Sequence, residues 1–180
     1  SAKLKSLNLF NCTALEEIRE FAFTCSPLTT LYLNNKLRVI GKYAFQYAKL
    51  TDLHLSRCAD LMLIGDYSFC NSRLSKIQMP PSLMFVGNVA FYNSQIEYLN
   101  LSLCTNLQTI GVSAFYESPL RKLQLPVSIR EIGGSAFFHA KLTQLDLKDC
   151  KHLQTIGHRA FYYSPLATLD FRGVSRHVKI

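Results

Sequence analysis

Seven phenylalanines recur along the chain at alternating intervals of 22 and 24 residues. Each ends a segment of the form Ile-Gly-x-x-Ala-Phe or a close variant, and the seven are Phe23, Phe45, Phe69, Phe91, Phe115, Phe137 and Phe161. The true period is therefore 46 residues, divided into two unequal half-units. Such a period is typical of repeat proteins, in which stacked coils bury one continuous core. We expect residues 1–180 to form a single solenoid and, since the chain starts at Ser1 without Met, to be a fragment of a longer protein.

The spacing of apolar residues within each half-unit predicts the shape of one coil. The long half-unit reads LxxLxLxxCxxLxxIGxxAF, and the short one lacks two residues after the second strand leucine. In LxxLxL the last two leucines are two residues apart, which puts both on one face of a strand. Leu-x-x-Ile-Gly is a second extended piece, whose Gly is expected to supply backbone angles that turn the chain, and xxAFxx is long enough for one helical turn. The sequence predicts a right-handed solenoid of about seven and a half repeats, with a parallel β-sheet on one face and short strands and one-turn helices on the others.

These motifs resemble the leucine-rich repeats, whose LxxLxLxx(N/C)xL pattern they match from Leu4 to about Phe171. The IGxxAF core and the LPxSI turn are similar to the BspA-like family of these repeats, found on the surfaces of bacteria and parasitic protists. The resemblance implies an adhesion or protein-binding solenoid, at the cell surface or secreted, with no catalytic residues and no cofactor. Two segments depart from the pattern. Arg19 stands where the other coils have Gly, and the residues after Phe171 either begin a cap or mark the end of the fragment.

Four of the six cysteines fall on one repeat position, at Cys12, Cys58, Cys104 and Cys150. Neighbours in this series are two coils apart, roughly 9–10 Å at two strand spacings, whereas a disulfide requires Cα atoms within ~7 Å. We therefore expect these four to be free, buried thiols that hold the turn backbone from inside. Cys25 and Cys70, also two coils apart, are expected to be free thiols as well. Cys150 and His152 are two potential ligands, but zinc needs three or four, so a metal site is the less favoured interpretation and none is predicted.

The charge and hydropathy of the chain narrow the kind of partner. The formal net charge is +8, but the basic residues are scattered and no nucleic-acid reading element accompanies them. No apolar run approaches the ~18 residues that span a bilayer. We therefore expect a protein partner, from a host or the extracellular matrix, and neither nucleic-acid binding nor membrane insertion. Association of the chain with its own copies stays open.

The outward positions of the first strand vary from coil to coil, while the leucine positions do not. Variable side chains on a rigid sheet suit partner recognition, and aromatic and basic groups are favoured at interfaces. Any soluble sheet also needs polar outward residues, so this pattern alone does not establish binding. The predicted binding residues are Tyr32, His54, Lys76, Tyr98, Lys122 and Asp146.

Two further sets of side chains are candidates for contacts. The positions just before the second-strand Ile or Val should point outward, yet in three successive coils they are apolar: Val39, Met62, Leu63, Met84 and Phe85. Contiguous apolar patches of this kind tend to be contact sites, which favours an alternative function as a structural or self-assembly segment of a larger protein. A stripe after the core Phe, at Tyr92, Tyr116, Phe138 and Tyr162, is interpreted as packing between coils.

Overall fold

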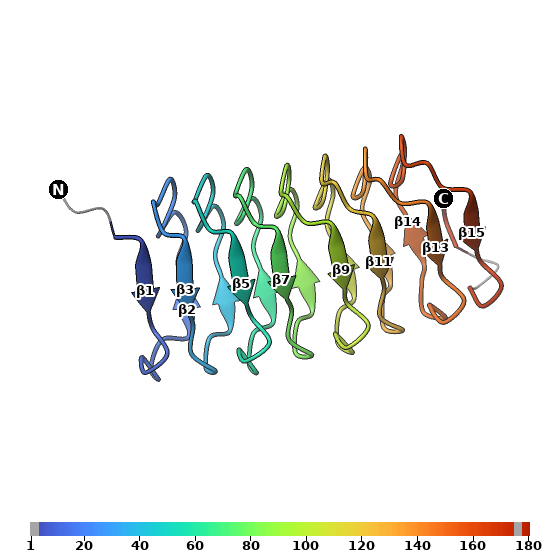
Figure 1. Cartoon of the computed structure of the whole chain (residues 1–180). Helices are drawn as coiled ribbons and strands as arrows, with labels where there is room; N and C mark the ends of the chain where they lie inside the picture. The colour runs from blue at the N-terminus through green and yellow to red at the C-terminus, as the bar shows by residue number, and fades with distance from the viewer. Residues whose placement is uncertain (1–3, 175–177) are drawn as a thin grey trace.

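The computed structural model describes residues 4–174 and 178–180, which form a straight rod of stacked coils with the two ends of the chain at opposite ends of the rod (Figure 1). Coils 1 to 8 begin at Leu4, Leu28, Leu50, Leu74, Ile96, Leu120, Leu142 and Leu166. Odd-numbered coils up to the seventh are long and even-numbered ones up to the sixth are short. The repeat architecture predicted from the phenylalanine period is confirmed.

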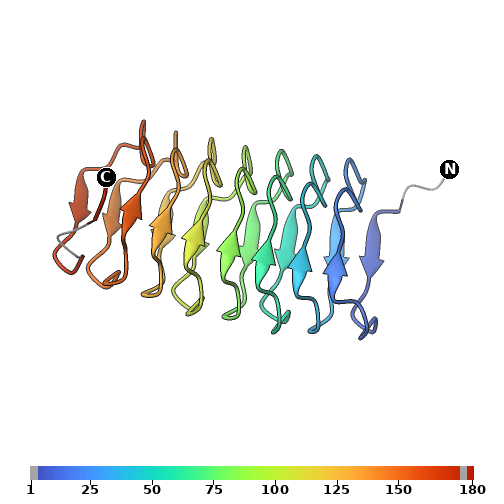
Figure 2. The same cartoon turned by 180° about the vertical axis from the view of Figure 1, so that it is seen from behind.

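Each coil contributes two short strands, which form two series along the rod. The first-strand series lies on the side seen in Figure 1, and its outward surface is called the strand face below; the second-strand series lies behind it (Figure 2). The first series is β1 (Ser6–Asn8), β3 (Thr30–Tyr32), β5 (Asp52–His54), β7 (Lys76–Gln78), β9 (Tyr98–Asn100), β11 (Lys122–Gln124), β13 (Gln144–Asp146) and β15 (Thr168–Asp170). The second series is β2 (Glu17–Ile18), β4 (Val39–Ile40), β6 (Leu63–Ile64), β8 (Phe85–Val86), β10 (Thr109–Ile110), β12 (Glu131–Ile132) and β14 (Thr155–Ile156).

The two series differ in how their strands pair. The second series forms one continuous parallel sheet of seven strands, in the order β14-β12-β10-β8-β6-β4-β2. The first series is divided into four parallel pairs, β1–β3, β5–β7, β9–β11 and β13–β15. Each pair joins the strand of a long coil to that of the next coil. The division therefore follows the alternation of half-unit lengths, and no ladder joins β3 to β5.

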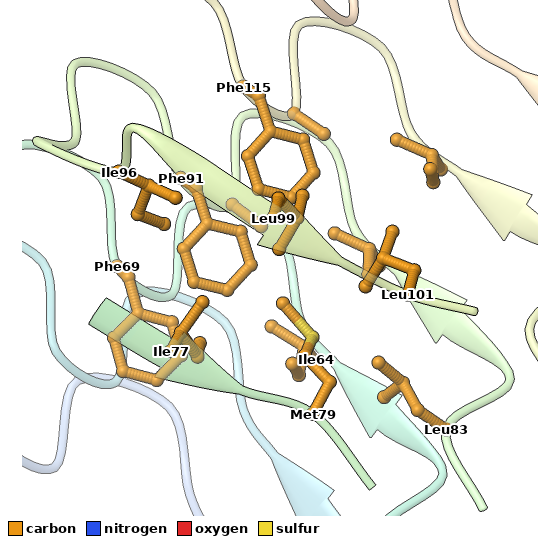
Figure 3. Packing of buried hydrophobic residues seen from close by; sticks show 14 of the residues in the cluster. Ile64, Phe69, Ile77, Met79, Leu83, Phe91, Ile96, Leu99, Leu101 and Phe115 are labelled. Atoms are coloured by element: carbon orange, nitrogen blue, oxygen red, sulfur yellow. The ribbon is translucent and has the colours of Figure 1, made fainter. Parts of the chain in front are cut away.

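The core is a file of phenylalanine rings inside the rod. Consecutive rings from Phe23 to Phe161 stack nearly parallel, with centroids 5.1–5.4 Å apart. Phe69, Phe91 and Phe115 lie one above the other among the strand leucines and isoleucines (Figure 3). Because each ring packs on the ring of the next coil, a coil buries its Phe only when it is stacked, as a solenoid requires.

The one-turn helices predicted for the xxAFxx segments are wrong. In the described parts of the chain these segments are overlapping turns, with no helix. Their N–H groups donate alternately within the coil and to the next coil: Ala44 N to Gly41 O at 3.3 Å, then Phe45 N to Ser68 O at 2.7 Å. Residues two before and two after each core Phe have positive φ, as at Tyr43 and Tyr47 with 56° each. Bonds between coils therefore replace the bonds of a helical turn.

The role expected for the glycines also needs correction. No described glycine has positive φ, so these residues are not needed for special backbone angles. A Cβ atom added at Gly41, Gly65, Gly87, Gly111 or Gly133 would come within 2.5–2.9 Å of the backbone of the preceding coil. Glycine is required because the coils touch there. Arg19 stands at this position in coil 1. None of the described coils precedes coil 1, so no backbone crowds the Arg19 side chain there.

The last described residues extend the second-strand series. Lys179 pairs in parallel with Thr155, and Lys179 O accepts a 2.8 Å hydrogen bond from Ile156 N. Residues 178–180 therefore continue the coil pattern past Phe171. Residues 175–177, which belong to the departing segment noted in the sequence, lie outside the described residues.

Candidate functional site

The structure places the six predicted binding residues on the strand face, all of them exposed. They do not form one line. Tyr32 and His54 occupy the last position of their strands, whereas Lys76, Tyr98 and Lys122 occupy the first. Tyr98 and Lys122 are direct partners in the β9–β11 ladder. The predicted track therefore consists of two parts, which lie at different heights on the face.

The sixth residue, Asp146, is held by its own turn. Its Oδ1 accepts a hydrogen bond from Lys148 N at 2.9 Å, and its Oδ2 lies 3.0 Å from Lys148 Nζ. The Lys148 backbone N–H and then its side chain hold the pKa of the Asp146 carboxyl below its usual range. The carboxylate is therefore already paired, which makes Asp146 the least available of the six.

A groove of about 450 Å³ opens where β3 and β5 lie side by side without a ladder. It is lined by Phe10, Leu31, Tyr32, Leu33, His54, Ser56, Arg57 and Gln78 and is called the β3/β5 groove below. Leu31 and Leu33 are buried, while Phe10 and Tyr32 are 48% and 54% exposed. The groove therefore combines an apolar lining with two aromatic side chains that are open to a partner. Its volume is within the range of ligand pockets.

The polar groups of the β3/β5 groove are mostly basic or uncharged. His54 Nε2 lies 3.5 Å from Asp52 Oδ1. Arg57 takes part in none of the ion pairs found among the described residues. Aromatic rings beside an unpaired arginine are typical of protein-binding surfaces.

Sequence reasoning found Tyr32 and His54 but missed Phe10 and Arg57. Both residues lie in the turns that follow β1 and β5, whereas the prediction was based on outward positions within the strands. The available signal was Phe10 itself. At the same repeat position the other coils have Asn34, Ser56, Pro80, Ser102, Pro126, Lys148 and Arg172, with no second aromatic.

The predicted apolar patch lies on the second-strand sheet. Val39, Leu63 and Phe85 are consecutive partners across β4, β6 and β8. Leu63 and Phe85 are 36% and 40% exposed, whereas Val39, Met62 and Met84 are half-buried. Their outward direction agrees with the sequence prediction, and their use as a contact stays a prediction.

The aromatic stripe after the core Phe packs between coils, as interpreted from the sequence. Tyr92, Tyr116 and Phe138 are half-buried, and their ring centroids are 5.3 Å and 4.6 Å apart in that order. Tyr162 continues the stripe at 5.6 Å from Phe138 but is exposed. The stacked rings turn their faces to one another, so most of their apolar surface is already covered.

The six cysteines are free thiols in the structure, and four of them are buried. Cys12 is exposed, which corrects the expectation that its whole series is buried, because the described chain has no coil packed on the outer side of coil 1. Cys25, in the same coil, is exposed as well. Cys150 Sγ lies 3.8 Å from Pro126 O. Stronger bonds to the turn backbone come from short coils, where Asn34, Ser82 and Ser128 contact carbonyls of the preceding long coil.

The described chain has neither a cluster of metal ligands nor a helix that could cross a membrane. No three His, Cys, Asp or Glu side chains converge on a metal-sized site in residues 4–174 and 178–180. Within the same residues there is no helix with the length and hydropathy to cross a bilayer.

A comparison with protein families identifies the repeat. The family described as "BspA type Leucine rich repeat region" matches residues 1–61 and 59–168, in six copies. The chain belongs to the BspA-type leucine-rich repeat family. The predicted resemblance, drawn from the IGxxAF core and the LPxSI turn, is confirmed.

Two solved structures are similar to this BspA-type chain. One is a leucine-rich repeat protein from Bacteroides ovatus, 17% identical, with a TM-score of 0.36 over 93% of this chain and 67% of that one. The other is a leucine rich cell surface protein from Faecalibacterium prausnitzii, 14% identical, with a TM-score of 0.33 over 94% of this chain and 78% of that one. Both TM-scores are low, so the family assignment depends on the sequence match. No curated protein matches the sequence.

Proposed function

We propose that this chain is a non-enzymatic adhesion module of a cell-surface protein, which binds a protein partner through the strand face. The observation that carries the proposal is the β3/β5 groove, where Phe10 and Tyr32 stand exposed beside the unpaired Arg57. Membership of a family of surface repeats supports the location. A host or matrix protein is the expected class of partner.

A second contact region extends the same face along the rod. Tyr98 is exposed and lies beside Lys122 in the β9–β11 ladder, and Lys76 is on the neighbouring strand β7. A partner that covers both regions spans coils 1 to 6. Truncating a central aromatic anchor typically costs ~2 kcal/mol or more, whereas a rim charge costs ~0–1 kcal/mol.

The proposal is tested by binding to an immobilised extract of extracellular matrix. Tyr32→Ala and Tyr98→Ala are each expected to weaken binding more than about tenfold, and Lys122→Ala to act mainly on the salt-dependent association rate. Tyr116→Ala is the control, because Tyr116 lies in the turn-side stripe. Equal losses from Tyr98→Ala and Tyr116→Ala in folded variants would exclude the strand face as the binding surface.

The apolar patch supports a second candidate function, as a structural or self-assembly segment. Leu63 and Phe85 are exposed neighbours on an otherwise regular sheet, and water-exposed apolar area favours association. If the patch mediates assembly, the double variant Leu63→Ser, Phe85→Ser should be monomeric at concentrations where the wild type sediments as a larger species. The same species for both proteins would remove this alternative.

A further inference from the structure

A side-chain oxygen caps the turn that follows the first strand in most long coils. The last residue of the strand accepts a hydrogen bond from the backbone N–H two residues later. The pairs are Asn8 with Phe10 at 2.9 Å, Asn100 with Ser102 at 3.0 Å, and Asp146 with Lys148 at 2.9 Å, and Asp170 with Arg172 repeats the arrangement in coil 8 at 3.0 Å. This is the local bond that Asn and Asp form in turns.

Coil 3 is the long coil that lacks this cap. Its strand ends in His54, and no acceptor for the Ser56 backbone N–H is found among the described residues. His54 Nε2 lies 3.5 Å from Oδ1 of Asp52, two residues earlier in the strand. Ser56 is exposed. The position that an Asn or Asp oxygen fills in the other coils is therefore open in coil 3.

The open position lies in the β3/β5 groove. Ser56 and Arg57 both line the groove, and Arg57 forms no ion pair within the described chain. A backbone N–H and a free guanidinium at adjacent residues are the donors that hold a carboxylate. The apolar walls beside them are Tyr32 and Phe10. The groove therefore offers donors for an anion and apolar surface for the group that carries it.

We propose that the β3/β5 groove binds an Asp or Glu side chain of the partner protein, next to an apolar side chain of the same partner. One carboxylate oxygen accepts the Ser56 N–H, in the place of the Asn8 oxygen of coil 1, and the other pairs with the Arg57 guanidinium. The apolar neighbour packs between Phe10 and Tyr32. An acidic side chain fits better than a chain terminus, because the strand face continues beyond the groove to Tyr98, and a partner chain that runs on covers both regions.

This proposal rests on the proposed function but has its own test, which uses small probes and the whole chain. The ¹⁵N-labelled protein is titrated with N-acetyl-Phe-Asp-amide and, in parallel, with N-acetyl-Phe-Asn-amide. The Asp probe is expected to move the Ser56 amide proton downfield with saturation, and the Asn probe to bind at least about fivefold more weakly, because it lacks the charge that pairs with Arg57.

His54→Asn is the decisive variant. It restores the cap found in coils 1, 5 and 7, so the protein should stay folded while the Ser56 N–H becomes occupied and the Asp probe binds about tenfold more weakly. Arg57→Ala should weaken binding to a similar extent. Arg73→Ala, which removes an exposed arginine outside the groove, is the matched control and should bind like the wild type.

Three results would overturn the carboxylate site. The first is equal binding of the Asp and Asn probes to the wild type, and the second is unchanged binding of the Asp probe to His54→Asn. The third is that the wild type binds N-acetyl-Asn-Phe, whose carboxylate is at the chain terminus, more tightly than it binds the Asp probe. The adhesion proposal fails separately. If Tyr32→Ala and Tyr98→Ala lose matrix binding but His54→Asn retains it, the strand face still binds a protein and only the assignment of the acid is wrong.

Discussion

Single atoms decide which residue stands at the corner after each second strand. A Cβ atom at Gly133 would lie 2.5 Å from the Gly111 carbonyl carbon and 2.5 Å from Val112 N, in the backbone of the preceding coil. At the next residue, Gly134, the nearest atom to an added Cβ is His158 O at 3.2 Å. Two adjacent glycines therefore have different tolerance for a methyl group.

Gly133→Ala is expected to destabilise the protein by about 2 kcal/mol or more, because two rigid backbones would have to separate. Gly134→Ala should change the free energy of unfolding by less than about 1 kcal/mol in either direction. The φ of Gly134 is not positive, so alanine can adopt it, and an alanine loses less backbone entropy on folding than a glycine does. Urea unfolding followed by circular dichroism measures both. A smaller cost at Gly133 than at Gly134 would contradict the close approach of the coils.

At the scale of the element, the turns of the long coils are held by polar side chains of the next coil. Asn34 is completely buried, and its Nδ2 donates to Cys12 O at 2.6 Å and to Leu15 O at 3.0 Å. Its Oδ1 accepts a hydrogen bond from Lys36 N at 2.8 Å. In later short coils Ser82 and Ser128 donate to the equivalent carbonyls, from a position two residues further along.

Asn34→Ala should lower the stability of the first two coils by about 3 kcal/mol, because it removes the partner of Leu15 O and of the Lys36 N–H, while Cys12 O keeps its bond from Leu15 N. Asn35→Ala is the control, since Asn35 is exposed and is expected to contribute little. In a solenoid such a loss is local, so it is best measured by amide exchange in β1 and β3. Equal exchange in the two variants would show that Asn34 does not anchor the turn.

The elements also show how far the sequence predicts this fold. The strands are predictable because their leucines repeat at fixed spacing and one coil cannot bury them alone. The helical turn at xxAFxx was wrong because its N–H groups find acceptors such as Ser68 O in the next coil, and such bonds are invisible to a pattern within one coil. Tyr32 and His54 were predictable as outward residues. Their groove was not, since it depends on which neighbouring strands form a ladder.

At the scale of the whole molecule, the core contains thiols that stay protonated. Burial raises the pKa of Cys58, Cys104 and Cys150 to about 11, whereas a thiol in an unfolded chain has a pKa of about 8.5. As the pH rises above ~8.5, these thiols lose their protons in the unfolded chain while they keep them in the folded protein. The stability from the buried neutral thiols is therefore complete below pH ~8.5 and is lost as the pH rises towards ~11.

The free energy of unfolding of the wild type should accordingly fall between pH 8 and pH 10.5. Cys104→Ala lowers the stability at pH 8 but should reduce the slope between these two pH values, because one buried thiol no longer titrates. Asn35→Ala, which removes no ionisable group, is the control and should keep the slope of the wild type. Identical slopes in all three proteins would show that thiol ionisation does not contribute to the pH dependence.

The alternation of long and short coils also limits how this rod can lengthen during evolution. Only long coils carry a cysteine at the position of Cys58 and Cys104, and a short coil of 22 residues, 74–95, separates these two. Deleting that coil would bring the two thiols to one strand spacing, ~4.8 Å, which is within the distance for a disulfide. Duplication in steps of 46 residues keeps every such pair apart. A gene that loses a single short coil, or gains a single long coil beside another, would instead acquire a pair of neighbouring thiols that can be oxidised inside the core.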